Sequence, residues 1–187
     1  MAITKIDPNS ALIAVDLQKG ILAMAAPADV ERIIANTTEL ANTFHELGLP
    51  VVWVRALGLP NGRVESSPPV GEPRPDFAEL HDDLPFKEGD LDIAKRATNA
   101  FLSQDLHALL QARGITNVIV IGIALGIGVE STVRAGFDSG YSMTVASDAT
   151  TDPMPGRAEA VLKFTLPMFS ESGTTAEILK ALRNAHA

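Results

Sequence analysis

Short apolar runs alternate along the chain with longer stretches in which apolar residues recur every three or four positions. The apolar runs are rich in Val and Ile and alternate little with polar residues, which is typical of parallel strands buried on both faces. The helical stretches between them indicate strand–helix–strand units with helices on both faces of a sheet. We therefore predict an α/β protein, a three-layer α/β/α sandwich around a central, mainly parallel sheet. The expected strands are residues 11–15, 51–55, 90–94, 117–121 and 142–146.

The clearest helix follows the first strand, where apolar residues from Val30 to Leu47 keep the spacing of one helix face. Asp29 is its predicted N-cap, and Gly48 followed by Pro50 predicts its end. Later helices are predicted at residues 103–113, from about 128 to 139, at 155–168 and at 174–185. The helix at 155–168 is expected to start with a proline in its first turn and to pack on the sheet.

Residues 57–75 contain three glycines and five prolines, so they predict neither a strand nor a helix. A loop of this length in a compact domain is functional or disordered. We interpret it as a cover over a substrate pocket or an arm that reaches a neighbouring subunit. A disordered excursion is the alternative.

Length, charge and cysteine content narrow the function classes. The 187 residues fit one domain, 1–187, and the net charge of −8 without a Lys/Arg cluster argues against nucleic acid as a partner. The amino-terminal segment lacks a signal-peptide layout, and no apolar run is long enough for a membrane span, so a cytoplasmic protein is expected. The absence of cysteine excludes thiol catalysis and disulfides. The four histidines have no partners at metal-ligand spacing and are expected at the surface.

Three polar or glycine-rich features fall where predicted strands end. Asp16 ends the first strand, Lys95 ends the third, and the turn Gly122–Gly128 follows the fourth. Ligands of parallel sheets collect at the carboxyl ends of the strands, so an acid, a cation and a helix amino terminus are expected to converge there. Each feature also has a simpler interpretation. The Asp can cap a turn, the Lys can be solvated, and the glycines can merely ease a tight turn.

Ordered landmarks along the chain resemble the isochorismatase-like hydrolases. Asp16-Leu-Gln18 is similar to the family's Asp-x-Gln motif, and Lys95-Arg-Ala-Thr-Asn-Ala-Phe101 to its Lys-x-x-x-x-Ala-Phe segment. The turn from Gly122 to Thr132 resembles its nucleophile loop, except that Gly128 stands where most members carry Cys. Gly140-Tyr141 and Asp148-Ala149 are the remaining landmarks. The resemblance covers nearly the whole chain and implies a Rossmann-like topology, with dimers or tetramers as the assembly.

The resemblance implies Asp16, Lys95 and Gly128 as the catalytic positions. In thiol members the aspartate takes the cysteine proton, the lysine assists, and amides hold the oxyanion. Gly128 cannot attack a carbonyl, but the family's isochorismatases also carry Gly there and cleave a vinyl ether with water. We therefore expect a thiol-independent hydrolase of a small anionic substrate. In it, Asp16 protonates the enol-ether methylene and Lys95 binds a carboxylate or balances the charge.

The same resemblance supplies the expected substrate contacts. Burial must keep the proton on Asp16, because Lys95 favours the ionised form. Amides at residues 126–129 are expected to hold the anionic end of the substrate, and a cis peptide is implied between Ile123 and Ala124. The expected substrate-binding residues are Gln18, Ile123, Ala124, Ile127 and Val129.

Departures from the family pattern leave the substrate open. Ala56 and Ala124 stand where the isochorismatases have a Gln and an aromatic residue, which argues against isochorismate itself. Residues 57–75 contain no histidine, so the zinc site of the nicotinamidase branch is not expected, nor is any cofactor.

Two other functions compete with this interpretation. Gly126-Ile-Gly128 with Asp148 imitates a dinucleotide-binding fingerprint, although Ser131 replaces its third glycine. The chain can also be a cysteine-type amidase whose nucleophile was lost to Gly, by inheritance or by engineering, and which is inactive or serves as a scaffold.

Overall fold

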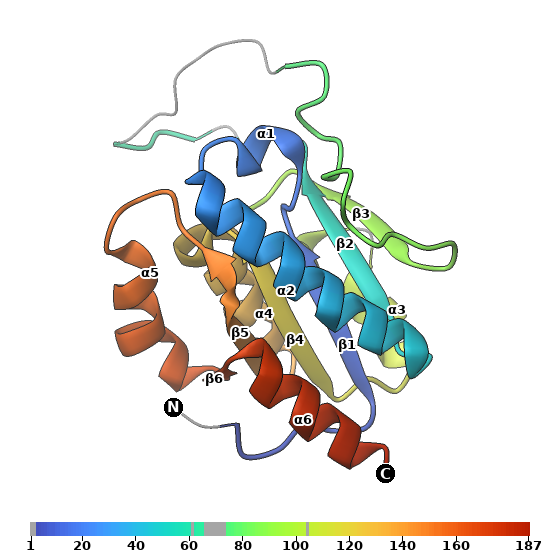
Figure 1. Ribbon diagram of the computed structural model, residues 1–187. Coiled ribbons are helices and arrows are strands. Elements are labelled where there is room, and N and C mark those ends of the chain that lie inside the picture. Colours follow the sequence, from blue (N-terminus) through green and yellow to red (C-terminus); the bar gives the residue numbers. More distant parts are fainter. Residues whose placement is uncertain (1–2, 61, 66–73, 104) are drawn as a thin grey trace.

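The computed structural model describes residues 3–60, 62–65, 74–103 and 105–187. In this part of the chain six parallel strands form one sheet with helices on both faces (Figure 1), which confirms the predicted three-layer sandwich. The strands are β1 (Ser10–Val15), β2 (Val51–Ala56), β3 (Leu91–Lys95), β4 (Asn117–Ile123), β5 (Ser142–Thr151) and β6 (Glu171–Gly173). The helices are α1 (Lys19–Leu22), α2 (Pro27–Glu46), α3 (Leu106–Ala112), α4 (Glu130–Asp138), α5 (Arg157–Ala160) and α6 (Thr175–Ala185).

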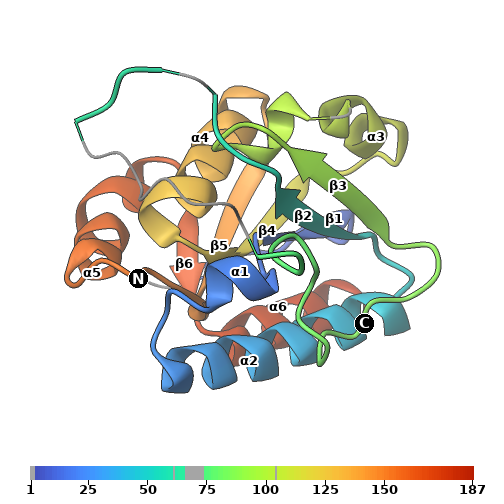
Figure 2. The ribbon, with the colours of Figure 1, turned by 90° about the horizontal axis from the view of Figure 1, so that it is seen from above.

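The strand order is β3-β2-β1-β4-β5-β6, which is the Rossmann-like order. The chain builds outward from β1 to one edge and then from β4 to the other, so the direction of winding reverses between these two central strands. Seen from above, α1, α2 and α6 lie on one side of the sheet, and α3 and α4 lie on the other (Figure 2). Such a reversal opens a crevice at the carboxyl ends of the strands, and there the polar side chains collect.

Two apolar layers hold the helices to the sheet. One layer joins the sheet to α2 and α6 and includes Trp53 and Phe44, both fully buried. The other joins it to α3 and α4 and includes Leu110 and Val133. All six residues of β1 are buried, as a central parallel strand requires.

The predicted start of α2 was wrong. The helix begins at Pro27, and Ala26 rather than Asp29 occupies the N-cap position. Proline suits the first helical turn because its missing N–H would be unpaired there in any case. Asp29 lies inside the helix and pairs with Arg32 at 2.7 Å.

His45 was expected at the surface but is mostly buried. Its Nε2 donates to Asp90 Oδ1 at 2.8 Å, and Trp53 Nε1 donates to Asp90 Oδ2 at 2.7 Å. Asp90 also accepts the backbone N–H of Lys87. The carboxylate thus joins α2 and β2 to the segment just before β3, which begins at Leu91 and not at residue 90.

The helix predicted at 103–113 is present as the shorter α3, whereas the helix predicted at 155–168 is divided into shorter pieces. A 3₁₀ turn, Ala100–Leu102, precedes α3, and Asn99 caps it by accepting the N–H of Leu102. The second stretch begins at residue 157, two positions after its proline, and continues beyond α5 as a π turn and a 3₁₀ turn. Met154 and Met168 at its two ends are exposed, so the predicted packing of these ends on the sheet was wrong.

The sequence pattern did not predict the last strand. The edge strand β6 is only three residues long and carries no periodic signal. In residues 57–75 the described positions form no helix or strand. Residues 61 and 66–73, on which a role as cover or arm depends, lie outside the described residues. No helix in the described ranges is long and apolar enough to cross a membrane.

Candidate active site

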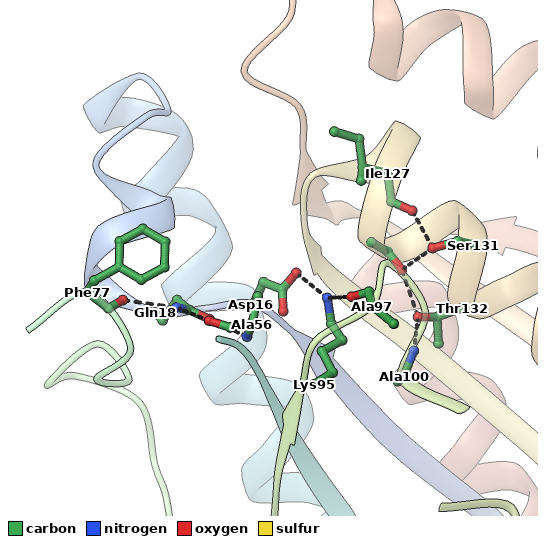
Figure 3. A network of polar contacts seen from close by, with 11 residues as sticks. Asp16, Gln18, Ala56, Phe77, Lys95, Ala97, Ala100, Ile127, Ser131 and Thr132 are labelled. Atoms are coloured by element: carbon green, nitrogen blue, oxygen red, sulfur yellow. Dashed lines mark hydrogen bonds and ion pairs between the residues drawn. The ribbon is translucent and has the colours of Figure 1, made fainter. Parts of the chain in front are cut away.

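An acid and a cation meet at the carboxyl edge of the sheet. Asp16 follows β1 in a left-handed backbone conformation, φ +57°, which is uncommon outside glycine. Lys95 is the last residue of β3, which β2 separates from β1. The lysine side chain crosses the end of β2, and its Nζ donates to Asp16 Oδ2 at 2.8 Å (Figure 3). The predicted convergence of Asp16 and Lys95 is therefore present in the structure.

Burial controls the protonation of this pair. Asp16 is 5% exposed and Lys95 is 2% exposed. Burial raises the pKa of Asp16 to about 6, although the Lys95 ammonium acts in the opposite direction. Asp16 Oδ1 is buried and has no hydrogen-bond partner among the described residues. Since Oδ2 accepts from Lys95, the proton of the neutral acid belongs on Oδ1.

Gly128 faces this carboxyl group. A β-carbon placed on Gly128 would lie 3.0 Å from Asp16 Oδ2 and 3.0 Å from Val15 Cγ1. A side chain at this position would therefore press on the oxygen that Lys95 binds. Gly128 belongs to a single π-helical turn, Leu125–Val129, which we call the π-turn. The turn follows β4 directly, and the Ile123–Ala124 peptide before it is cis, as the resemblance implied.

The expected cradle of free amides is largely occupied. Gly126 donates its backbone N–H to Asp152 Oδ2 at 2.9 Å. The N–H groups of Ile127 and Val129 both donate to the carbonyl of Ala124, at 3.1 and 3.2 Å. Three of the four amides assigned to the anionic end of a substrate therefore already have acceptors within the protein.

The remaining substrate-binding candidates differ in what they offer. The carbonyl oxygen of Ile123 lies 3.7 Å from the β-carbon position of Gly128, so it faces the same space as the acid. Ala124 is half-buried and Ile127 is 41% exposed, whereas Val129 is fully buried in the apolar layer under α4. The substrate contacts of Ile123, Ala124 and Ile127 stay predictions, whereas Val129 packs within the apolar layer.

Gln18, just after β1, connects the end of β2 to the segment that contains Phe77. It is fully buried, and its Oε1 accepts the N–H of Ala56 at 2.7 Å. Its Nε2 donates to the carbonyls of Ala56 and Phe77, at 3.0 and 2.9 Å (Figure 3). Both N–H bonds and the carbonyl oxygen are thus engaged within the protein, so Gln18 positions these segments, and its expected substrate contact stays a prediction.

Sequence reasoning missed an ion pair beside the π-turn and a hydroxyl behind it. Asp152 is fully buried and pairs with Arg157 at 2.7 Å. Thr132 Oγ1 donates to the carbonyl of Gly128 at 2.7 Å and accepts the N–H of Ala100 at 3.0 Å. Asp152 comes directly after β5, so the rule that singled out Asp16 at a strand end applied to it as well.

The dinucleotide interpretation loses its acidic residue. Asp148 Oδ1 accepts the backbone N–H of Thr175 at 2.7 Å and its hydroxyl at 2.8 Å. The carboxylate therefore serves the first turn of α6 and is not presented to a ribose.

Three hollows in the described surface lie away from the Asp16–Lys95 pair. Volumes of about 700, 630 and 510 Å³ are found beside β6, at the amino ends of β1 and β2, and between α1 and the start of α2. No group of three or more His, Asp or Glu side chains that could hold a metal ion occurs within the described ranges.

Comparison with known proteins identifies relatives over almost the whole chain. The isochorismatase domain model matches residues 10–177. The uncharacterized isochorismatase family protein YwoC of Bacillus subtilis (strain 168) is 32% identical over 184 residues, covering 94% of this chain and 95% of that protein. Ureidoacrylate amidohydrolase RutB of Stutzerimonas stutzeri (strain A1501) is 29% identical, with 86% and 77% covered.

A solved structure has the same fold at similar sequence identity. An isochorismatase family protein from Burkholderia thailandensis superposes with a TM-score of 0.87 and is 32% identical. The match covers 97% of this chain and all of that one (100%).

Proposed function

Because the chain belongs to the isochorismatase family, whose members are hydrolases, we propose that it is a thiol-independent hydrolase of a small anionic substrate. The bond we propose for cleavage is a vinyl ether or a related bond that water can open after protonation. The observation that carries this proposal is the state of Asp16. Its pKa is raised to about 6 by burial, and its Oδ1 has no partner among the described residues.

The proposed reaction begins with proton transfer. Asp16 Oδ1–H donates to the terminal methylene carbon of an enol ether, and an oxocarbenium ion forms at the ether carbon. Water adds to this carbon and returns a proton to the Asp16 carboxylate. The hemiketal then breaks its bond to the ether oxygen, which yields a 2-oxo acid and an alcohol. One water is consumed and the acid is regenerated, so no enzyme nucleophile is needed at position 128.

Lys95 has two effects in this scheme. Its ammonium stabilises the Asp16 carboxylate that forms when the proton leaves, and its charge attracts an anionic substrate. Arg96, the next residue, is exposed at the rim and donates to the carbonyl of Leu57 at 3.2 Å. Lys95 and Arg96 are therefore better candidates for binding an anionic substrate than the amides of the π-turn.

A second candidate is a lost amide hydrolase. The relative RutB is named for ureidoacrylate amidohydrolase activity, and 29% identity makes an amide substrate worth testing. The β-carbon position of Gly128, 3.0 Å from Asp16 Oδ2, is where a cysteine would give its proton to the aspartate. In that case the present chain would be inactive or a binding protein.

One experiment separates the two candidates. The parent, Gly128→Cys and Asp16→Asn are compared on carboxylate-bearing vinyl ethers and on small amides and ureido acids. Vinyl-ether cleavage by the parent, lost in Asp16→Asn, supports the proposal. The reaction in D₂O should place one deuterium in the methyl group of the 2-oxo acid. Amide cleavage gained only by Gly128→Cys, with an inactive parent, would replace the proposal by the second candidate.

A further inference from the structure

The two glycines of the π-turn face different neighbours. Gly128 faces Asp16, as described above. A β-carbon placed on Gly126 would instead lie 2.8 Å from Cγ and Cδ of Arg157. The aliphatic part of the Arg157 side chain therefore rests on the turn at Gly126, two residues from the position that meets the acid.

The Asp152 carboxylate holds the amino end of this turn. Its Oδ2 accepts the N–H of Gly126 at 2.9 Å, and its Oδ1 accepts the N–H of Met154 at 2.9 Å. Arg157 Nε lies 2.8 Å from both oxygens. A second nitrogen of the same guanidinium, Arg157 Nη2, lies 2.7 Å from Oδ1. The Asp152 side chain is 0% exposed, and these four N–H donors take the place of water around its carboxylate. Burial alone would raise the pKa of Asp152, but Arg157 and the two amides outweigh it and lower the pKa.

The carboxyl end of the turn is held independently. The carbonyl of Gly128 accepts from Thr132 Oγ1, which in turn accepts from the amide of Ala100, a residue shortly after Lys95. Gly128 is thus fixed between a clamp at Gly126 and a hydroxyl bridge to the Lys95 segment. The gap between Gly128 and Asp16, where a β-carbon would already be at 3.0 Å, therefore lies between these two anchors.

We propose that Asp152, gripped by Arg157, is a positioning residue that sets the distance between the π-turn and Asp16. Insofar as the space beside Asp16 is the reaction site, this inference rests on the proposed function. The same carboxylate occupies the place where a substrate anion would accept the Gly126 amide. The anionic end of the substrate must therefore be held by other groups.

The test replaces the carboxylate and then restores it from solution. In Asp152→Ala, the Gly126 amide and the Arg157 guanidinium face an empty space. We expect kcat/KM to fall about 10- to 100-fold, since small misplacements at a reacting centre have effects of this size. Sodium formate should recover part of the rate, and sodium chloride at equal concentration should not. Asp7→Ala is the matched control, because it removes a carboxylate paired with Lys5 beside Thr116, at the opposite, amino end of β4.

Two readouts do not depend on knowing the substrate. The amide signals of Gly126 and Gly128 in ¹⁵N NMR should shift in Asp152→Ala and move back with formate. The titration midpoint of the Asp16 carboxyl carbon should fall from about 6 toward its ordinary value of 3.8, because water enters beside the acid. An unchanged Gly128 signal and an unchanged Asp16 midpoint in a folded Asp152→Ala protein would overturn the inference, even if the parent hydrolyses its substrate. An inactive parent with shifted signals would instead refute only the proposed function.

A second variant covers the case in which Asp152→Ala does not fold. Arg157→Lys keeps the positive charge but loses the two-nitrogen grip on Asp152. The signals of Gly126 and Gly128 must then shift by a smaller amount in the same direction. Signals identical to those of the parent would contradict the proposal.

Discussion

The Lys95 ammonium binds only one oxygen of Asp16. Its Nζ lies 2.8 Å from Oδ2, while Oδ1 has no partner among the described residues. An ion pair alone would engage the carboxylate and lower its pKa, but burial opposes this and raises the pKa of Asp16 to about 6. The carboxyl group of Asp16 is therefore half protonated near pH 6, so it can act as a general acid in mildly acidic solution.

The first prediction concerns the pH dependence of the rate. The pKa of Asp16 is raised, so the acid is protonated below about pH 6 and ionised above it. If the protonated form is the catalyst, kcat/KM should fall as the pH rises through about 6, roughly tenfold per pH unit above the midpoint. Initial rates on a vinyl ether between pH 4 and 9 provide the check. A rate that increases through this range would indicate a base in place of the acid.

The second prediction concerns Lys95→Met. The ammonium lowers the pKa of Asp16, so its removal should raise that pKa above 6 and move the fall in rate to higher pH. The maximal rate should decrease by about 10²–10⁴-fold, because the carboxylate formed in the transition state loses its counter-charge. Lys180→Met, an exposed lysine on α6, is the matched control. A profile that superposes on the parent's would remove Lys95 from the mechanism.

The third prediction concerns the space at position 128. In Gly128→Ala the new methyl group would meet Asp16 Oδ2 and Val15 Cγ1 at 3.0 Å, so the carboxylate or the Val15 side chain must give way by a few tenths of an ångström. We expect a loss of activity with a destabilisation of about 1–3 kcal/mol, as for other overpacked sites. Gly62→Ala should change neither, because a β-carbon at Gly62 meets nothing within 4 Å. Rates and urea unfolding measure both effects, and full activity in Gly128→Ala would show that the gap is not critical.

The fourth prediction separates Gln18 from the substrate. Gln18→Leu leaves the N–H of Ala56 and the carbonyls of Ala56 and Phe77 without their buried partner. Each unpaired buried group costs about 1–3 kcal/mol, so unfolding should become easier by about 2–4 kcal/mol in total. Urea unfolding and hydrogen exchange at the Ala56 amide are the measurements, with exposed Gln111→Leu as control. A higher KM without a change in stability would restore the substrate-binding interpretation.

The sheet and the acid–lysine pair could be predicted from the sequence because both leave local signals along the chain. Buried Val/Ile runs locate five of the strands, and strand ends locate Asp16 and Lys95. The Asp90 carboxylate, which binds His45 and Trp53, depends instead on three segments that only the folded chain brings together. For the same reason the sequence could not show that Asp152 already occupies the Gly126 amide, or that Gln18 is engaged by two carbonyls. Hydrogen-bond partners distant in sequence leave no periodic trace.

The proposed role of Asp16 requires a carboxyl group that is half protonated near pH 6, and this can be tested without a substrate. The most direct measurement is a ¹³C NMR titration of the Asp16 carboxyl carbon in the intact parent protein, assigned with Asp16→Asn. We predict a midpoint near 6, because burial outweighs the attraction of Lys95. A midpoint at or below the ordinary value of 3.8 would show a permanently ionised carboxylate and contradict the account.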